Sequence, residues 1–206
     1  MEEEENINGR YYVNEKLEFE GNIYFGKKYN GKGYDENGNV IYEIKNGKGK
    51  VREYNYKYGY FIFEGEYLNG KRHGKGKEYD LFGRLRFEGE FLNGEKTGKG
   101  KEYAHEGKLK FEGEFLKWRR HGKGKEYEDK TGELIFKGEY FKGERWNGKG
   151  KEYEGGGLIF DGEYINGKKH GKRKKYNPKG ELIFEEEYIN NEEEEKNEDS
   201  SSSSSS

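Results

Sequence analysis

The sequence lacks cysteine altogether and has a single proline, Pro178, and a single alanine, Ala104. Without cysteine the chain can form no disulfide bond, no thiolate metal site and no cysteine nucleophile. No stretch has the run of apolar residues that a membrane span needs, and the acidic start does not resemble a secretion signal. We therefore expect a cytoplasmic location, either free or peripheral to a membrane or the cytoskeleton.

Aliphatic residues are also scarce. The hydrophobic class makes up 29% of the 206 residues and charged residues make up 40%, a balance that on its own is typical of disordered chains. The chain nevertheless has 13 Phe, 19 Tyr and 2 Trp, which supply more large apolar faces than disordered chains normally carry. We expect a folded core built from aromatic rings.

Charge and serine are unevenly distributed along the chain. The net charge is −2, but acidic residues gather in residues 1–9 and 192–206, and every serine lies in residues 200–206. Residues 10–191 therefore carry an excess of bases. We expect an acidic leader over residues 1–9, a repeat array over residues 10–191 and a disordered tail over residues 192–206.

An internal repeat of about 24 residues organises the array into about seven units. Six phenylalanines recur at steps of 24 or 25 residues: Phe63, Phe87, Phe111, Phe136, Phe160 and Phe184. Residues 85–92 alternate in character with a period of two, which indicates a β-strand. A second strand is expected from about Gly74 to Tyr79, after the hairpin-favouring pair Asn69–Gly70. Residues 80–84 would return the chain to the next hairpin.

The pattern G-E-Y-x-N-G-K-x-x-G-K-G-x-x-Y, clearest over 63–76 and 160–172, resembles the MORN repeat (membrane occupation and recognition nexus) across most of residues 19–188. The longer linker between units is also similar to a MORN variant of bacterial antitoxin-like proteins. This resemblance implies an all-β fold of tandem β-hairpins in an elongated, twisted single-layer antiparallel sheet. Leucine-rich and choline-binding repeats are excluded by the few aliphatic residues and two Trp; YD-type toxin-shell repeats remain an alternative.

Glycine recurs at one position of the first strand in each unit. These glycines are Gly65, Gly89, Gly113, Gly138 and Gly162. In a single-layer sheet, a ring from a neighbouring strand can lie flat over a residue that has no Cβ. We expect each of these glycines to seat such a ring.

Residues that commonly carry catalysis are missing or repeated. Residues 10–191 contain no serine, and Thr97 and Thr131 fall in expected connections. The equivalent histidines, His73, His121 and His170, would lie about 19 Å or more apart, too far to share a metal. Carboxylates such as Glu64 recur in each unit and are expected to pair with lysines like Lys77 across strands. We expect no enzyme, no cofactor and no metal.

Basic residues gather at one connection of each unit, and hairpin geometry would align these connections along one edge about every 9.6 Å. The candidate contacts for an anionic partner are Lys71, Arg72, Arg119, Arg120, Lys168, Lys169, Lys172, Arg173, Lys174 and Lys175. An anionic membrane lipid fits such an edge. Nucleic acid is not expected, because the chain as a whole is acidic.

An exposed apolar stripe is also expected, because one layer of sheet cannot cover both of its faces. Its residues, candidates for self-association as a homodimer, are Leu68, Leu92, Leu116, Phe141 and Ile165. The resemblance to MORN proteins implies scaffolding, dimerisation and lipid binding. We expect a non-catalytic scaffold or tether that mediates protein–protein interaction. The alternative is a peripheral membrane module that binds anionic phospholipids or phosphoinositides through the basic connections.

Overall fold

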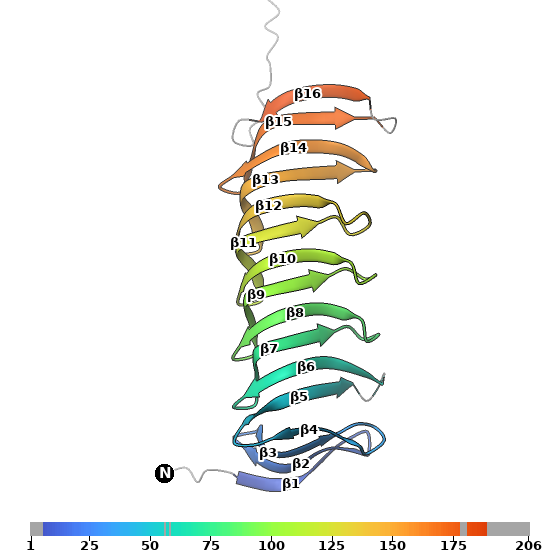
Figure 1. The fold of residues 1–206 in the computed structure, drawn as a ribbon, viewed down its shortest axis with the longest axis vertical. Coiled ribbons are helices and arrows are strands. Elements are labelled where there is room, and N and C mark those ends of the chain that lie inside the picture. Colours follow the sequence, from blue (N-terminus) through green and yellow to red (C-terminus); the bar gives the residue numbers. More distant parts are fainter. Residues whose placement is uncertain (1–5, 56, 58, 178–180, 189–206) are drawn as a thin grey trace, which may run out of the picture. The chain divides into compact units, whose positions relative to one another are not determined.

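The computed structural model describes residues 6–55, 57, 59–177 and 181–188. These residues divide into two compact units, with the boundary between Glu144 and Arg145. Within them, sixteen strands form open antiparallel sheets of successive hairpins, as Figure 1 shows, which confirms the predicted all-β fold. In this part of the chain no helix has the length and apolar character needed to cross a membrane.

The first unit contains two sheets in which strands follow their order in the chain. The first sheet is β1 (Asn6–Val13), β2 (Lys16–Tyr24), β3 (Lys27–Tyr34) and β4 (Val40–Ile44). The second runs through β5 (Lys48–Asn55), β6 (Tyr60–Leu68), β7 (Lys71–Tyr79), β8 (Leu85–Leu92), β9 (Glu95–Tyr103), β10 (Leu109–Leu116), β11 (Arg119–Tyr127) and β12 (Leu134–Phe141). β1 takes in residues 6–9 of the predicted leader, whereas residues 1–5 lie outside the described residues.

The second unit continues the hairpin pattern. Its strands, again in chain order, are β13 (Glu144–Glu154), β14 (Gly157–Ile165), β15 (Lys168–Tyr176) and β16 (Leu182–Tyr188). The predicted tail, residues 192–206, lies outside the described residues, so its disorder stays a prediction.

Tight turns and return connections lie at opposite edges of the β5–β12 sheet (Figure 1). Asn69 and Gly70 have φ angles of 51° and 70°, the positive pair that a type I′ hairpin turn requires. The return connection over residues 80–84 lies where it was predicted. The second strand, however, begins at Lys71 and not near Gly74, because Gly74 forms a bulge with a φ of 61° and lets the strand continue.

The core of the β5–β12 sheet is a row of aromatic rings on one face, which we call the ring face. Consecutive rings meet edge to face with centroids 5.0–5.5 Å apart, an arrangement that aromatic quadrupoles favour. In order along the sheet, the row is Phe63, Phe91, Phe87, Phe115, Phe111, Tyr140 and Phe136. Phe63 comes from β6, and the other six rings come from β8, β10 and β12 in the next three hairpins, so the row links successive repeats.

Three phenylalanines of this row, Phe63, Phe87 and Phe111, each cover two glycines that face each other across a strand pair. A Cβ added at Gly65 would lie 2.7 Å from Cζ of Phe63, in the same strand, and 2.6 Å from Cα of Gly76. A Cβ at Gly76, in the next strand, would lie 2.6 Å from Cζ of Phe63. The prediction of ring seats is therefore right about the glycines and wrong about the rings, which come from the same strand for positions like Gly65.

The same rule holds elsewhere in the repeat. Gly89 and Gly113 would place a Cβ 2.7 Å from Cζ of the phenylalanine two residues earlier, and Gly162 would do so at 2.8 Å from Phe160. Gly138 faces Gly124 in the β11–β12 pair. The facing residue is not always glycine: Val51 faces Gly65 across the β5–β6 pair.

Pairing between β14 and β15 is short. The register that the described residues give covers Ile165–Lys168, Tyr164–Lys169 and Glu163–His170, next to the turn. Elsewhere, as between β10 and β11, the pairing continues through the facing glycines.

Candidate functional site

A cation lies over three of the buried phenylalanines on the ring face, Phe63, Phe87 and Phe111. The Arg72 guanidinium carbon is 4.3 Å from the ring centroid of Phe63, and Lys96 Nζ is 4.1 Å from that of Phe87. The guanidinium carbon of Arg120 lies 4.4 Å from the ring centroid of Phe111 in the next hairpin. These side chains come from strands of the same sheet, so the sheet covers its own core with cations.

Carboxylates hold these cations in place. Arg72 bridges Glu53 at 2.8 Å and Glu78 at 2.6 Å, one on each side. Arg120 bridges Glu102 and Glu126 in the same way, both at 2.9 Å. Lys96 Nζ lies 2.7 Å from a carboxylate oxygen of Glu78. An ammonium acts as a compact point charge, whereas the planar guanidinium of arginine presents several donors in a fixed geometry.

These ion pairs are partly buried, and this shifts the pKa of their members. Burial alone would raise the pKa of Glu53, but hydrogen bonds from Arg72 and Tyr67 outweigh it and lower that pKa below its usual range. Burial and the neighbouring Glu53 carboxylate raise the pKa of Tyr67. The Glu53 interaction therefore stabilises the fold above the carboxylate's unfolded pKa and is lost as the pH falls through its folded pKa.

The ten basic candidates do not form one surface. The expectation that they lie in connections is wrong, because the bulges keep them inside strands β7, β11 and β15. Arg72 and Arg120 point to the ring face and pair with glutamates. In the second unit Lys169 lies over the ring of Phe160 and pairs with Glu152. Lys71, Arg119 and Lys168 are exposed beside the tight turns. The side chains of Lys172, Arg173 and Lys175 lie outside the described residues.

The exposed bases beside the turns are separated by acids. In each hairpin the residue after the tight turn faces an apolar residue of the preceding strand: Lys71 faces Leu68, Glu95 faces Leu92, and Arg119 faces Leu116. The edge thus alternates in sign from hairpin to hairpin. In the second unit Lys174 lies 4.0 Å from Glu185, and the register sets residues 172 and 173 opposite glutamates of β16.

The predicted apolar stripe lies on the face opposite the ring face, which we call the outer face. Leu92, Leu116 and Phe141 are 50%, 49% and 41% exposed beside the tight turns, and Leu68 is half-buried. Ile165 is 41% exposed at the equivalent place in the second unit. The structure therefore places these five residues where the stripe was predicted, within their separate units.

Three further uncharged residues fill the spaces between the members of the stripe in the first unit. The strand register sets His73 beside Leu92 and Thr97 beside Leu116. His121 lies beside Phe141, with ring centroids 5.8 Å apart. We call the resulting row the apolar strip; its members are Leu68, His73, Leu92, Thr97, Leu116, His121 and Phe141.

The apolar strip crosses seven adjacent strands, β6 to β12, and is therefore about 29 Å long at roughly 4.8 Å per strand. Thr97 was predicted to lie in a connection, and the place of Thr97, His73 and His121 in the strip was not foreseen. The signal was present: His73, Thr97 and His121 each come directly before a glycine, and those glycines are the bulges. Because each bulge keeps the chain in a strand, these side chains reach the outer face.

A row of charges borders the apolar strip on the side away from the turns. Lys75 faces Glu90, Lys99 faces Glu114, and Lys123 faces Glu139 between successive hairpins. All six side chains are exposed, and the three lysines form no ion pair with another described residue. Sign alternates strictly from strand to strand along this row, which we call the alternating row.

The remaining carboxylates of the outer face pair across strands, as predicted. Glu112 accepts hydrogen bonds from Lys125 and Tyr127, both at 2.9 Å, and the Lys125 bond lowers the pKa of Glu112. Tyr103 donates to Glu88 at 2.6 Å, and burial with this bond raises the pKa of Tyr103 to about 12. The same pairing recurs in successive repeats, and no three His, Asp or Glu of the described residues are placed to hold a metal.

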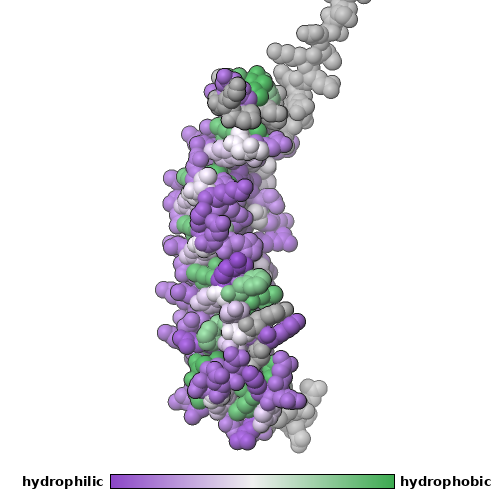
Figure 2. Space-filling view, turned by 90° about the vertical axis from the view of Figure 1, so that its right-hand side faces the viewer, coloured by the Kyte–Doolittle hydropathy of each residue, from purple (hydrophilic) through white to green (hydrophobic). Residues whose placement is uncertain are grey.

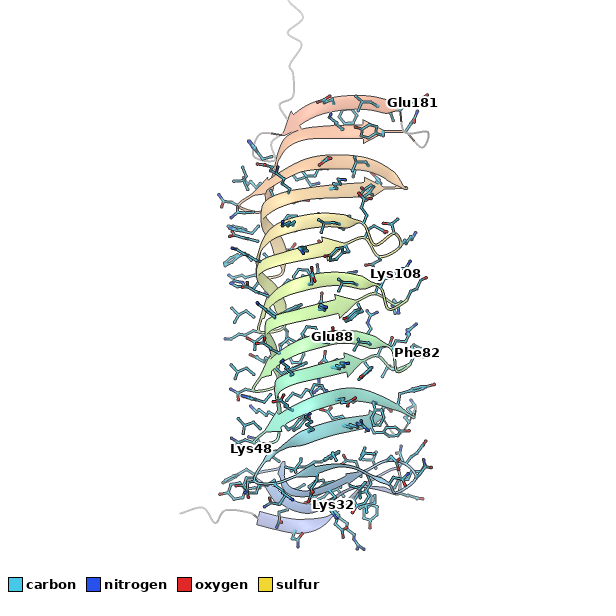
Figure 3. The ribbon with its side chains drawn as sticks, viewed as in Figure 1. Lys32, Lys48, Phe82, Glu88, Lys108 and Glu181 are labelled. Atoms are coloured by element: carbon cyan, nitrogen blue, oxygen red, sulfur yellow. The ribbon has the colours of Figure 1, made fainter. Side chains whose placement is uncertain are left out.

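A separate apolar patch lies at the edge with the return connections. Leu81 and Phe82 are 51% and 69% exposed, and Figure 3 shows Phe82 pointing away from the sheet at this edge, opposite the edge of Lys48. Asp80 accepts backbone hydrogen bonds within the connection and fixes it. Figure 2 views this edge and shows small green areas among a mainly purple surface. The patch is confined to one connection.

The tight turn between β10 and β11 is strained. Trp118 has a φ of 71°, in the left-handed region. In the other tight turns of the described residues the equivalent residue is Glu15 in one and glycine in six: Gly26, Gly47, Gly70, Gly94, Gly143 and Gly167. A bulky residue in this conformation is costly and is found where the surroundings or a function require it. Trp118 is 47% exposed, with Lys96 Nζ 5.7 Å from its ring. The strained residue lies two positions after Leu116 of the apolar strip.

No protein-family model matches this chain, and no curated protein matches it either. The assignment to tandem β-hairpin repeats therefore rests on the 24-residue spacing and on the strand pairing of the described residues.

Proposed function

We propose that this chain is a MORN-like, non-catalytic repeat scaffold that binds a partner protein through the apolar strip. The observation that carries the proposal is a strip about 29 Å long, without lysine, arginine or acidic residues, on a face that otherwise presents mainly lysine, glutamate and tyrosine. An apolar centre with a charged rim is the usual anatomy of a protein-binding surface.

The position of Trp118 also favours a binding role for the edge of the sheet that carries the tight turns. Tryptophan is enriched among residues that dominate binding energy, and an exposed tryptophan kept at a glycine position costs the fold stability. A binding role at the turn beside Leu116 would explain that cost. The second unit presents Ile165 at the equivalent place, so its outer face is proposed to contribute in the same way.

An anionic membrane is the competing partner. The pairing of Arg72 and Arg120 with glutamates, and the presence of Glu95 between exposed bases, argue against a strong contribution from lipid. Each base near an anionic membrane contributes about 1 kcal/mol, and acids within a Debye length of about 8 Å offset it.

The test compares two leucines of equal exposure. Leu116→Glu places a charge in the apolar strip, and Leu81→Glu places the same charge on the return connection. With the immobilised full chain as bait for a cell lysate, we expect Leu116→Glu to lose the captured proteins and Leu81→Glu to retain them. Thermal unfolding should be nearly unchanged in both, since surface substitutions cost within about 0.5 kcal/mol.

Flotation with vesicles that contain phosphatidylserine and phosphoinositide completes the test. We expect little flotation at physiological salt. Strong, salt-sensitive flotation that Leu116→Glu leaves unchanged would contradict the proposal and favour the membrane module.

A further inference from the structure

We infer that the apolar strip of the first unit binds a second copy of this chain, with the strand order of that copy reversed. The inference rests on the proposed function and names the partner of the same surface. Two properties of the strip point to this partner: its spacing and the charges of the alternating row.

The repeat distance of the apolar strip is matched by the strip of a second copy. Leu92, Leu116 and Phe141 recur once per hairpin, which is about 9.6 Å along the sheet. A surface with any other repeat distance would lose step with these side chains within a few strands. A second copy has the same repeat, so its side chains remain in step over the whole strip.

The alternating row selects the direction of the second copy. If two copies faced each other with the same strand order, the strands would run in opposite directions and the alternating row would lie over the turn edge of the second copy. Lys75 would then lie over Lys71 and Lys123 over Arg119, so that like charges meet. If the order is reversed about a two-fold axis parallel to the strands and between β9 and β10, Lys99 lies over the second copy's Glu114. Opposite charges then meet along the row, and each contact occurs twice, as a two-fold interface requires.

The same axis pairs the apolar residues. Leu116 then lies over the second copy's Thr97, Leu92 over its His121, and His73 over its Phe141. A strip of this length and two or three residues in width covers about 400 Å² on each copy, roughly half of a standard interface. We therefore expect weak association, with a dissociation constant in the micromolar range.

The natural absence of cysteine allows a direct test of direction. His73→Cys and Phe141→Cys lie five strands apart within one chain, about 24 Å, and cannot join to each other there. A full chain with both substitutions should form a disulfide-linked dimer under mild oxidation, whereas His73→Cys alone should not. Efficient dimer formation by His73→Cys alone would show the same strand order and overturn the inference.

Sedimentation velocity over a concentration series tests whether the apolar strip and the alternating row form the contact between the two copies. We expect the unmodified chain to associate, Leu116→Glu to be monomeric and Leu81→Glu to associate as the unmodified chain does. Lys99→Glu should weaken association at least about tenfold, and the double variant Lys99→Glu with Glu114→Lys should restore most of it. Equal weakening by Leu81→Glu, or no recovery in the double variant, would overturn the inference.

The two proposals can fail separately. An unmodified chain that stays monomeric at every concentration, while Leu116→Glu still abolishes capture of other proteins, would overturn the inference and leave the proposed function standing. Loss of neither association nor capture in Leu116→Glu would overturn both.

Discussion

The Gly124→Val variant is expected to lose about 3 kcal/mol of its free energy of unfolding. A Cβ at Gly124 would lie 2.5 Å from Cζ and 2.6 Å from Cε2 of Phe111, and 3.3 Å from Tyr140. Phe111 is fully buried in the ring row, so it cannot move without parting from the rings on either side. Overpacking of this kind costs about 1–3 kcal/mol and sometimes more. Here the contacts of Phe111 with Phe115 and Tyr140, and the guanidinium of Arg120 above its ring, would all shift together.

Urea unfolding of both chains, followed by far-ultraviolet circular dichroism, measures this loss. The matched control is Gly9→Val in β1, where the nearest atom to an added Cβ is 4.0 Å away in Tyr11. Gly9 also faces a glycine, Gly21, across its strand pair. A similar loss in both variants would mean that valine in a strand is harmful for a reason other than the ring over Gly124.

Arg120→Met is expected to cost about 3 kcal/mol, because it leaves Glu102 and Glu126 without their shared partner above Phe111. The side chain of Arg120 is only 15% exposed, so solvent screens this interaction little. Methionine keeps the apolar stem over the ring, and the loss therefore reports mainly on the charge. Its neighbour Arg119 is exposed and points to the other face.

Arg119→Met is the control, and it should cost less than about 0.5 kcal/mol. The two variants remove the same charge from adjacent positions of one strand, so their net charge is identical. Thermal and urea unfolding would distinguish them. Equal stability of the two variants would show that the ion pairs over the ring add nothing that a methionine cannot replace.

The hairpins could be predicted from sequence because their signals are local. Asn69–Gly70 selects a tight turn from its backbone preferences alone, and the alternation over residues 85–92 identifies a strand whichever neighbour it pairs with. The exposed positions of Leu92 and Leu116 followed from the same alternation. These features depend on no contact beyond the hairpin.

The direction of Arg72 could not be predicted in this way. A bulge adds a residue to one strand, and a shift of one residue turns each following side chain to the other face. Gly74 is such a bulge, but its sequence context, with two glycines among basic residues, is also typical of a loop. Reading it as a loop gave one basic edge, whereas the structure divides Lys71 and Arg72 between solvent and the ring face.

The position of the Phe63 ring over Gly65 and Gly76 was harder still to predict from the sequence. Phe63 and Gly65 are two residues apart in one strand, but Gly76 becomes their neighbour only when the turn and the bulge set the register. The partners of Arg72 likewise come from β5 and β7, on either side of the strand that holds Phe63. Contacts of this kind depend on the alignment of three strands and not on the preference of any one.

The edge-to-face contact of Phe87 with Phe115 joins residues 28 positions apart, and the ion pair of Arg120 with Glu102 joins residues 18 apart. Contacts in the β5–β12 sheet thus link hairpins that follow each other in the chain, which keeps contact order low and the loops to be closed short. The sheet can therefore grow one hairpin at a time while the chain is synthesised. Each new hairpin then folds against the exposed edge of the last one, and its phenylalanine completes the cover of the rings already in place.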